Sequence, residues 1–145
     1  MSRSIQLVFD TGDPDRQARF WAEALGYRLQ APPDGFDTWE AFLRKQGIPE
    51  ERWNDASAII DPDGVGPRIF FQRVPEGKTA KNRMHMDLNA SGGREIVLEE
   101  RKHRVDAEVA RLKTLGATDR RGAMERDGEY WVRMNDPEGN EFCVQ

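Results

Sequence analysis

The last ten residues read DPEGNEFCVQ, from Asp136 to Gln145, and a related stretch, DPDGVGPRIFFQ, runs from Asp61 to Gln72. Each begins with an Asp-Pro-acidic-Gly sequence, which is typical of a tight turn because Pro presets φ and Gly accepts a positive φ. A short run that favours a β-strand follows each turn, and the second run carries the only cysteine, Cys143. The recurrence indicates that the chain consists of two similar halves.

The similarity between the halves continues outside the turns. A Leu-Gly pair that is typical of a helix end occurs at Gly26 and again at Gly116. When the first half is allowed two extra residues after its turn, Phe70 aligns with Cys143. Each half is therefore expected to form one strand–helix–three-strand unit. This predicts an α+β protein with two tandem βαβββ modules.

Local patterns place the elements within each half. Residues 5–10 predict the first strand, and Asp13 followed by Pro14 predicts a helix that ends at Gly26. The second helix is predicted from apolar residues at helical spacing, which are Val105, Val109, Leu112 and Leu115. Further strands are expected at residues 27–30, 56–60, 68–74, 83–90, 130–134 and 141–145.

A polar insertion, residues 31–55, interrupts the first half and is interpreted as a lid. Residues 38–46 within it predict a short helix, which Pro49 closes. Trp39 and Trp53 lie on this insertion and are candidates for an aromatic surface over a ligand. The alternative is that both tryptophans pin the insertion to the body of the protein.

Composition excludes several classes of partner. The 145 residues include 22 basic and 26 acidic side chains, well interspersed, with a formal charge of −4. Because no basic run can follow a phosphate backbone, nucleic acid is not expected as a partner. No stretch approaches the roughly 20 apolar residues of a membrane span. The first residues, MSRSIQLVFD, show no signal peptide, and a single cysteine fits a reducing compartment, so a cytoplasmic location is expected.

Three stretches taken together carry a family resemblance. They are DPDRQARFWAEALGY (13–27), NRMHMDL (82–88) and DPEGNEFCVQ (136–145). In this combination the chain resembles the vicinal oxygen chelate superfamily, which includes glyoxalase I, extradiol dioxygenases, and fosfomycin- and bleomycin-resistance proteins. It is most similar to the glyoxalase-like domain proteins of actinobacteria. The resemblance covers nearly the whole chain except the insertion at 31–55.

The resemblance implies one domain over residues 1–145, with module 1 at about 3–76 and module 2 at about 82–145. In that fold the curved sheets of the two modules form a cup with flanking helices. Strand alternation assigns faces, so that residues such as Ile5 and Met84 should cover the helices. The opposite faces then supply the cup floor, which consists of Gln6, Val8, Phe70, Gln72, His85, Asp87 and Cys143.

The metal site of the family can be tested against this chain. The resemblance implies four ligand positions, which fall on Gln6, Phe70, His85 and Cys143. Gln6 and His85 are residue types that the family uses, but Phe70 and Cys143 stand where it has carboxylates. Because a divalent ion in this family needs about two carboxylates, neither the usual metal nor another cofactor is expected. A relocated divalent site that uses Asp87 or Gln72 remains the alternative.

Three residues of the cup floor carry chemical hypotheses. His85 is a candidate metal ligand or proton-transfer group, or else a hydrogen-bonded histidine that comes with the fold. Asp87 would orient His85 or a ligand, with the capping of a loop amide as the alternative. Cys143 would act as a nucleophile only if a base activated it, and otherwise packs as a small apolar side chain.

These observations favour a protein that binds an unidentified small organic molecule in the cup, without the usual metal. Its role would be sequestration, or a metal-independent reaction that uses His85 and Asp87. One alternative is a metal-dependent lyase or isomerase of the glyoxalase I type, or a dioxygenase-like enzyme, whose chemistry requires a Lewis acid. Another is a non-catalytic interaction module. A homodimer formed through edge strands is compatible with the resemblance.

Overall fold

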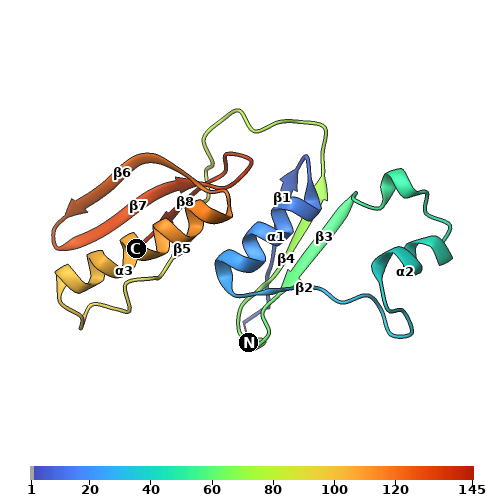
Figure 1. Cartoon of the computed structure of the whole chain (residues 1–145), viewed down its shortest axis with the longest axis horizontal. Helices are drawn as coiled ribbons and strands as arrows, with labels where there is room; N and C mark the ends of the chain where they lie inside the picture. The colour runs from blue at the N-terminus through green and yellow to red at the C-terminus, as the bar shows by residue number, and fades with distance from the viewer. Residues whose placement is uncertain (1) are drawn as a thin grey trace. The chain divides into compact units, whose positions relative to one another are not determined.

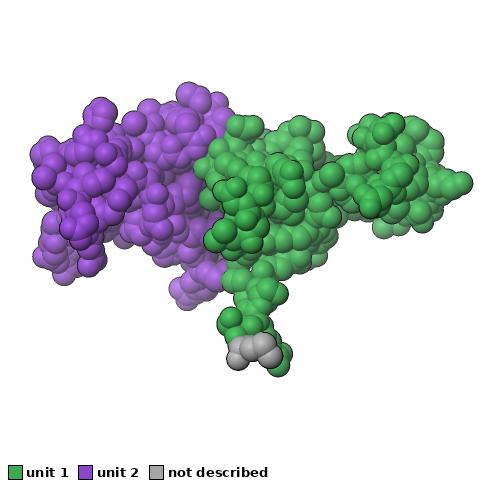
Figure 2. Space-filling view, turned by 90° about the horizontal axis from the view of Figure 1, so that it is seen from below, with its two compact units in different colours: residues 1–77 green, residues 78–145 purple. Residues whose placement is uncertain are grey.

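The computed structural model describes residues 2–145 and divides into two compact units (Figure 2). Unit 1 ends at Gly77, and unit 2 begins at Lys78. Each unit forms its own four-stranded mixed sheet. Within residues 2–145, no helix combines the length and apolar character required to cross a membrane.

Unit 1 has the order strand–helix–three strands, with the insertion between its second and third strands (Figure 1). Its sheet has the order β1-β4-β3-β2, in which β1 runs parallel to β4 and the other neighbours are antiparallel. The elements are β1 (Gln6–Thr11), α1 (Pro14–Leu25), β2 (Arg28–Leu29), β3 (Ala56–Ile60) and β4 (Arg68–Arg73).

The helix α1 begins and ends where the sequence predicts. The Asp13 carboxylate accepts a hydrogen bond from the Arg16 amide at 3.2 Å, and Pro14 occupies the first turn. Gly26 ends the helix with a φ of 70°, in the left-handed region. The buried Trp21 packs on Phe9 of β1, with ring centroids 5.5 Å apart. This apolar contact fixes one face of the sheet under α1.

Unit 2 repeats the topology of unit 1. Its sheet has the order β5-β8-β7-β6, again with the first strand parallel to the last. The predicted α+β class with tandem βαβββ modules is therefore confirmed. The elements are β5 (Asp87–Leu88), α3 (Leu98–Leu115), β6 (Thr118–Arg126), β7 (Glu129–Asn135) and β8 (Glu141–Val144).

The strand predicted at 83–90 is wrong in length, because β5 contains only Asp87 and Leu88. β5 lies at the edge of the sheet, and its single neighbour β8 starts only after the turn at Asp136. It pairs with β8 only at Cys143 and Val144, although β8 begins at Glu141. Met84 lies outside the strand and is 74% exposed, so its predicted place against a helix is also wrong.

Other boundaries also differ from the prediction. The helix α3 begins at Leu98, earlier than its apolar pattern indicates, because its first turns are charged and use pairs such as Glu100 with Arg104 at 2.8 Å. The sequence predicted no residue range for the strand β6, since its sequence TDRRGAMER is polar almost throughout. In unit 1, Ile5 is 68% exposed and does not cover the helix.

The insertion contains α2 (Trp39–Lys45), capped by Thr38, and a 3-10 turn η1 (Glu50–Arg52) after Pro49. It projects from the sheet of unit 1 (Figures 1 and 2). The Trp39 indole donates to the Gln30 carbonyl at 2.7 Å, next to β2, and the Trp53 indole donates to the Ile48 carbonyl at 2.9 Å. The Trp39 bond favours the pinning role because Gln30 lies outside the insertion, whereas the Trp53 bond lies within the insertion. The role of both tryptophans as a lid stays a prediction.

Both Asp-Pro turns are held by the aspartate side chain. Asp136 is 2% exposed, and its Oδ1 accepts from the backbone amides of Glu138 and Asn140, each at 2.9 Å. Its Oδ2 accepts from the Asn140 side chain, also at 2.9 Å. In unit 1, Asp61 accepts from the backbone amide of Gly66 at 2.6 Å in the same manner. The turns therefore depend on a carboxylate and not only on Pro and Gly.

The substitution Asp136→Ala is expected to lower the free energy of unfolding by about 2–3 kcal/mol, because two turn amides lose their acceptor. Asp136→Asn keeps one carbonyl acceptor and should cost less. Glu95→Ala removes an exposed acid of unit 2 and serves as the control. Urea denaturation measures all three variants. Equal stability of Asp136→Ala and the wild type would contradict the role of this carboxylate.

Candidate functional site

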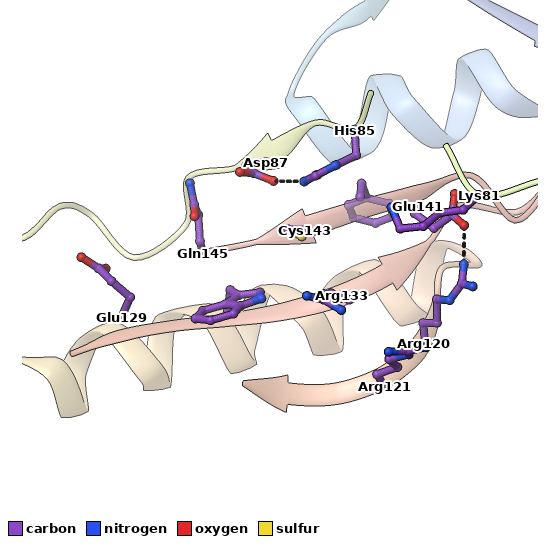
Figure 3. Close-up of a pocket in the computed structure, with 12 residues that line it drawn as sticks. Lys81, His85, Asp87, Arg120, Arg121, Glu129, Arg133, Glu141, Cys143 and Gln145 are labelled. Carbon is purple, nitrogen blue, oxygen red and sulfur yellow. Dashed lines mark hydrogen bonds and ion pairs between the residues drawn. The ribbon is translucent and has the colours of Figure 1, made fainter. Parts of the chain in front are cut away.

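A pocket of about 550 Å³ lies within unit 2 and is called the unit-2 pocket (Figure 3). It contains three of the seven predicted cup-floor residues, together with charged and aromatic side chains from β6, β7 and β8. The lining residues are Lys81, His85, Asp87, Arg120, Arg121, Glu129, Trp131, Arg133, Glu141, Phe142, Cys143 and Gln145.

Strand register explains how the centre of the pocket is assembled. Asp87 of β5 pairs with Cys143 of β8, and Cys143 pairs with Arg133 of β7. Because neighbouring strands lie about 4.8 Å apart, these three side chains stand in a row on one face of the sheet. Phe142 and Val144 alternate with Cys143 and are buried. The faces predicted for β8 are confirmed.

His85, Asp87 and Cys143 form a compact cluster at one end of this row. The His85 Nε2 atom lies 3.4 Å from Oδ1 of Asp87 (Figure 3). One potential ligand atom from each of the three residues lies within 4.8 Å of the others. About two-fifths of the His85 and Asp87 side chains is exposed, so both can contact a molecule in the pocket.

The Cys143 thiol is stabilised in its protonated form. Burial raises the pKa of Cys143, and the charge of Asp87 and a hydrogen bond to its carboxylate raise the pKa further. The charges of Arg133 and Lys81 oppose this effect. Since a thiolate is the nucleophilic form, this environment favours a packed, hydrogen-bonded thiol over the predicted alternative of a nucleophile.

Glu141 is tied to the wall of the pocket by several donors. Its carboxylate accepts from the Asn82 amide at 3.0 Å and pairs with Lys78 at 3.1 Å and with Arg120. Burial alone would raise the pKa of Glu141, but these partners together lower the pKa to about 2. Glu129 is likewise paired, with Arg94 at 3.0 Å and Arg101 at 3.2 Å.

The basic and aromatic groups of the unit-2 pocket were missed by the sequence analysis. Trp131 and Arg133 alternate with the buried Val132 and Met134 on a strand that was predicted, so alternation could have placed them on the pocket face. Arg120 and Arg121 lie on β6, which lacks a strand-like apolar pattern. For these two arginines the sequence gives no signal.

The other predicted cup-floor residues lie on the sheet of unit 1. Val8 pairs with Phe70 in register, and the Gln72 side chain donates to Asp10 at 2.7 Å. Gln6 pairs with Arg68, and Val8 is 51% exposed. The structure therefore brings Gln6, Val8, Phe70 and Gln72 to one face of one sheet, as alternation predicts.

The metal positions of the family do not fit a divalent ion. In unit 1 the Gln6 side-chain oxygen already accepts from the Arg68 guanidinium at 2.6 Å. The same guanidinium lies 5.3 Å from the centre of the Phe70 ring, and phenylalanine supplies no donor atom. A fixed cation at this place repels a metal ion. In unit 2, His85 keeps a suitable donor, but Cys143 replaces a carboxylate with a thiol that stays protonated.

The alkylation of Cys143 by iodoacetamide tests this electrostatic arrangement. Asp87→Asn should lower the thiol pKa and speed alkylation near neutral pH, because the carboxylate raises that pKa. Arg133→Gln should slow alkylation, because its charge has the opposite effect. The dependence of the alkylation rate on pH gives the pKa of each variant, with His103→Gln as a control on α3. An unchanged profile for Asp87→Asn would contradict the contact.

Comparisons with known proteins agree with the fold. The model of the glyoxalase-like domain family matches residues 6–145. Among solved structures, the chain is similar to a glyoxalase/bleomycin resistance protein/dioxygenase family enzyme from Burkholderia phytofirmans PsJN, with 15% identity and a TM-score of 0.60, covering 96% of this chain and 94% of that one. It is also similar to the fosfomycin resistance protein FosX from Mesorhizobium loti, with 11% identity, a TM-score of 0.60, and coverage of 99% and 91%.

A third similar structure is a possible glyoxalase from Bacillus cereus, with 15% identity, a TM-score of 0.59, and coverage of 100% of this chain and 99% of that one. Among curated proteins, no sequence matches the chain. The structural matches share the fold at low identity, and the family model spans almost the whole sequence. The chain belongs to the glyoxalase-like domain family, within the vicinal oxygen chelate superfamily.

Proposed function

We propose that the protein binds a small organic molecule in the unit-2 pocket without the divalent metal usual in the family. The pocket itself is the observation that carries this proposal. Its volume of about 550 Å³ lies in the range of small-molecule sites, which combine apolar walls with a few convergent polar groups. Here Trp131 supplies apolar surface, and His85, Asp87 and Arg133 supply the polar groups.

The pair of His85 and Asp87 determines what chemistry this pocket can support. A carboxylate near an imidazole orients the ring, and an oriented imidazole can transfer a proton to or from a bound molecule. Their side chains lie 3.4 Å apart and remain accessible. The protein therefore either holds its ligand unchanged or moves a proton on it. The fosfomycin resistance protein among the similar structures supports a protective role only by analogy.

Metal-dependent chemistry is the second candidate. His85, Asp87 and Cys143 present nitrogen, oxygen and sulfur donors within 4.8 Å of one another, and zinc accepts this kind of mixed set. This set differs from the four positions of the family, because Asp87 is added and Gln6 and Phe70 are left out. It would require Cys143 to lose the proton that its surroundings retain.

The location and assembly of the protein extend this proposal. A cytoplasmic location fits the single cysteine of the chain. A homodimer formed through edge strands fits sheets whose outer strands have one hydrogen-bonded neighbour each. Size-exclusion chromatography with light scattering measures the mass in solution, and a monomer at all concentrations would contradict the dimer.

Ligand binding is tested by a thermal-shift screen of small aromatic and apolar compounds. At least one compound is expected to raise the Tm of the wild type and of Trp39→Phe, which changes the insertion and leaves the unit-2 pocket intact. The same compound should have a smaller effect on Trp131→Ala, because the apolar wall is lost. The proposal fails if no compound stabilises the wild type, or if Trp131→Ala responds as the wild type does.

Metal content separates the two candidates. Elemental analysis of the purified protein is expected to show no stoichiometric divalent ion, because the ligand positions of the family are incomplete. Added Zn²⁺, Ni²⁺ or Mn²⁺ should leave the Tm unchanged. One tightly bound ion per chain that is lost in His85→Ala, but kept in the control His103→Ala, would establish the second candidate instead.

A further inference from the structure

The charges of the unit-2 pocket are unevenly matched. Its lining includes three carboxylates, and each of them already has partners. Glu141 pairs with Lys78 and Arg120. Glu129 pairs with Arg94 and Arg101, which reach it from α3 and the loop before it. Asp87 lies beside His85 and accepts a hydrogen bond from the Cys143 thiol. Two of the three carboxylates, Glu129 and Glu141, are therefore paired with cations, and Asp87 is hydrogen-bonded.

Three cations of the same lining have no such compensation. Within residues 2–145, Lys81, Arg121 and Arg133 form no ion pair with a carboxylate. The Lys81 ammonium donates to the Asn82 carbonyl at 3.3 Å. Positive charge is thus left over in the pocket, where an anionic ligand would find it.

Arg133 differs from an ordinary surface arginine. It is half-buried on β7, next to Cys143 in register, and in Figure 3 it lies at the centre of the pocket face. Arg133 and Lys81 line the same pocket, and the charge of each lowers the pKa of the Cys143 thiol. A half-buried guanidinium without a carboxylate partner among the described residues can bind an oxyanion through two parallel, charge-assisted hydrogen bonds.

We propose that the unit-2 pocket selects an organic anion, whose carboxylate or phosphate-type group binds Arg133 and Lys81 while its apolar part contacts Trp131. Trp131 and Arg133 are two residues apart on the same strand face, about 7 Å along the strand. An acidic group on a short linker from an aromatic ring spans such a distance. This inference rests on the proposed function and specifies the chemical class of its ligand.

The test uses three probes of similar shape and different charge, namely phenylacetate, phenylphosphonate and the neutral phenylacetamide. Binding is followed by NMR, with the Trp131 indole signal as the reporter. Both anions, or the one whose oxyanion geometry fits, are expected to bind at least about ten-fold more tightly than the amide. The comparison of carboxylate with phosphonate identifies which acidic group the site prefers.

Variants then assign the effect to one guanidinium. Arg133→Gln should weaken anion binding by about 10- to 100-fold and leave amide binding unchanged, because only a charged hydrogen bond is lost. Arg133→Lys keeps the positive charge but loses the two parallel N–H donors of the guanidinium. It should therefore weaken anion binding less than Arg133→Gln does. Arg126→Gln is the control, because this arginine of unit 2 has an 81% exposed side chain and lies outside the pocket lining. This variant should bind both the anions and the amide as the wild type does.

Failure of this inference can be told from failure of the proposed function. If the amide binds as tightly as both anions, or if Arg133→Gln and Arg133→Lys bind the anions as the wild type does, the selection of an anion is overturned while pocket binding stands. The same holds if neutral compounds of the thermal-shift screen bind and neither anion does. If no compound of either kind binds, both proposals are overturned.

Discussion

The buried carboxylate of Asp136 is the constraint on which the unit-2 pocket depends. By accepting two backbone amides and one side-chain amide, it fixes the turn that joins β7 to β8. That turn sets the register in which Cys143 faces Arg133, and the same strand then aligns Cys143 with Asp87 of β5. A slip of one residue would exchange the pocket face with the buried face. Asp61 anchors the corresponding turn of unit 1.

The exchange of metal ligands for other residues is matched by cations on the same strand faces. In unit 1, Phe70 stands at a position that the resemblance assigns to a carboxylate, and the Arg68 guanidinium lies over its ring. In unit 2, Cys143 stands at the other such position, and Arg133 lies beside it in register. Neither Phe70 nor Cys143 supplies the carboxylate charge that would help to hold a divalent ion. A fixed guanidinium in such a site can attract an anionic molecule directly.

The sequence predicted the fold because its repeat, caps and turns are local signals. Asp13, Gly26 and the two Asp-Pro turns act within a few residues of themselves, so their effects do not depend on tertiary contacts. The edge strand β5 is different, because it pairs with only two residues of β8, and the sequence at 83–90 does not show where this pairing begins. The polar strand β6 is stabilised by antiparallel pairing with β7 rather than by an apolar pattern of its own.

The residues of the candidate site were predictable where they follow strand alternation, and not where they depend on tertiary contacts. His85, Asp87 and Cys143 meet in one pocket because they follow strand alternation, which the sequence shows directly. Arg120 and Arg121 could not be placed there, since their position depends on β6 and on its irregular register between Asp119 and Ala123. The pairing that neutralises Glu141 and leaves Arg133 available is also a tertiary property.

Calorimetric titration of phenylacetate or phenylphosphonate before and after exhaustive treatment with EDTA tests the central claim most directly. If guanidinium and ammonium groups bind the ligand in place of a metal ion, the affinity should be the same in both titrations and should fall with added salt. Loss of binding after EDTA, with recovery on addition of a divalent ion, would contradict a metal-free site.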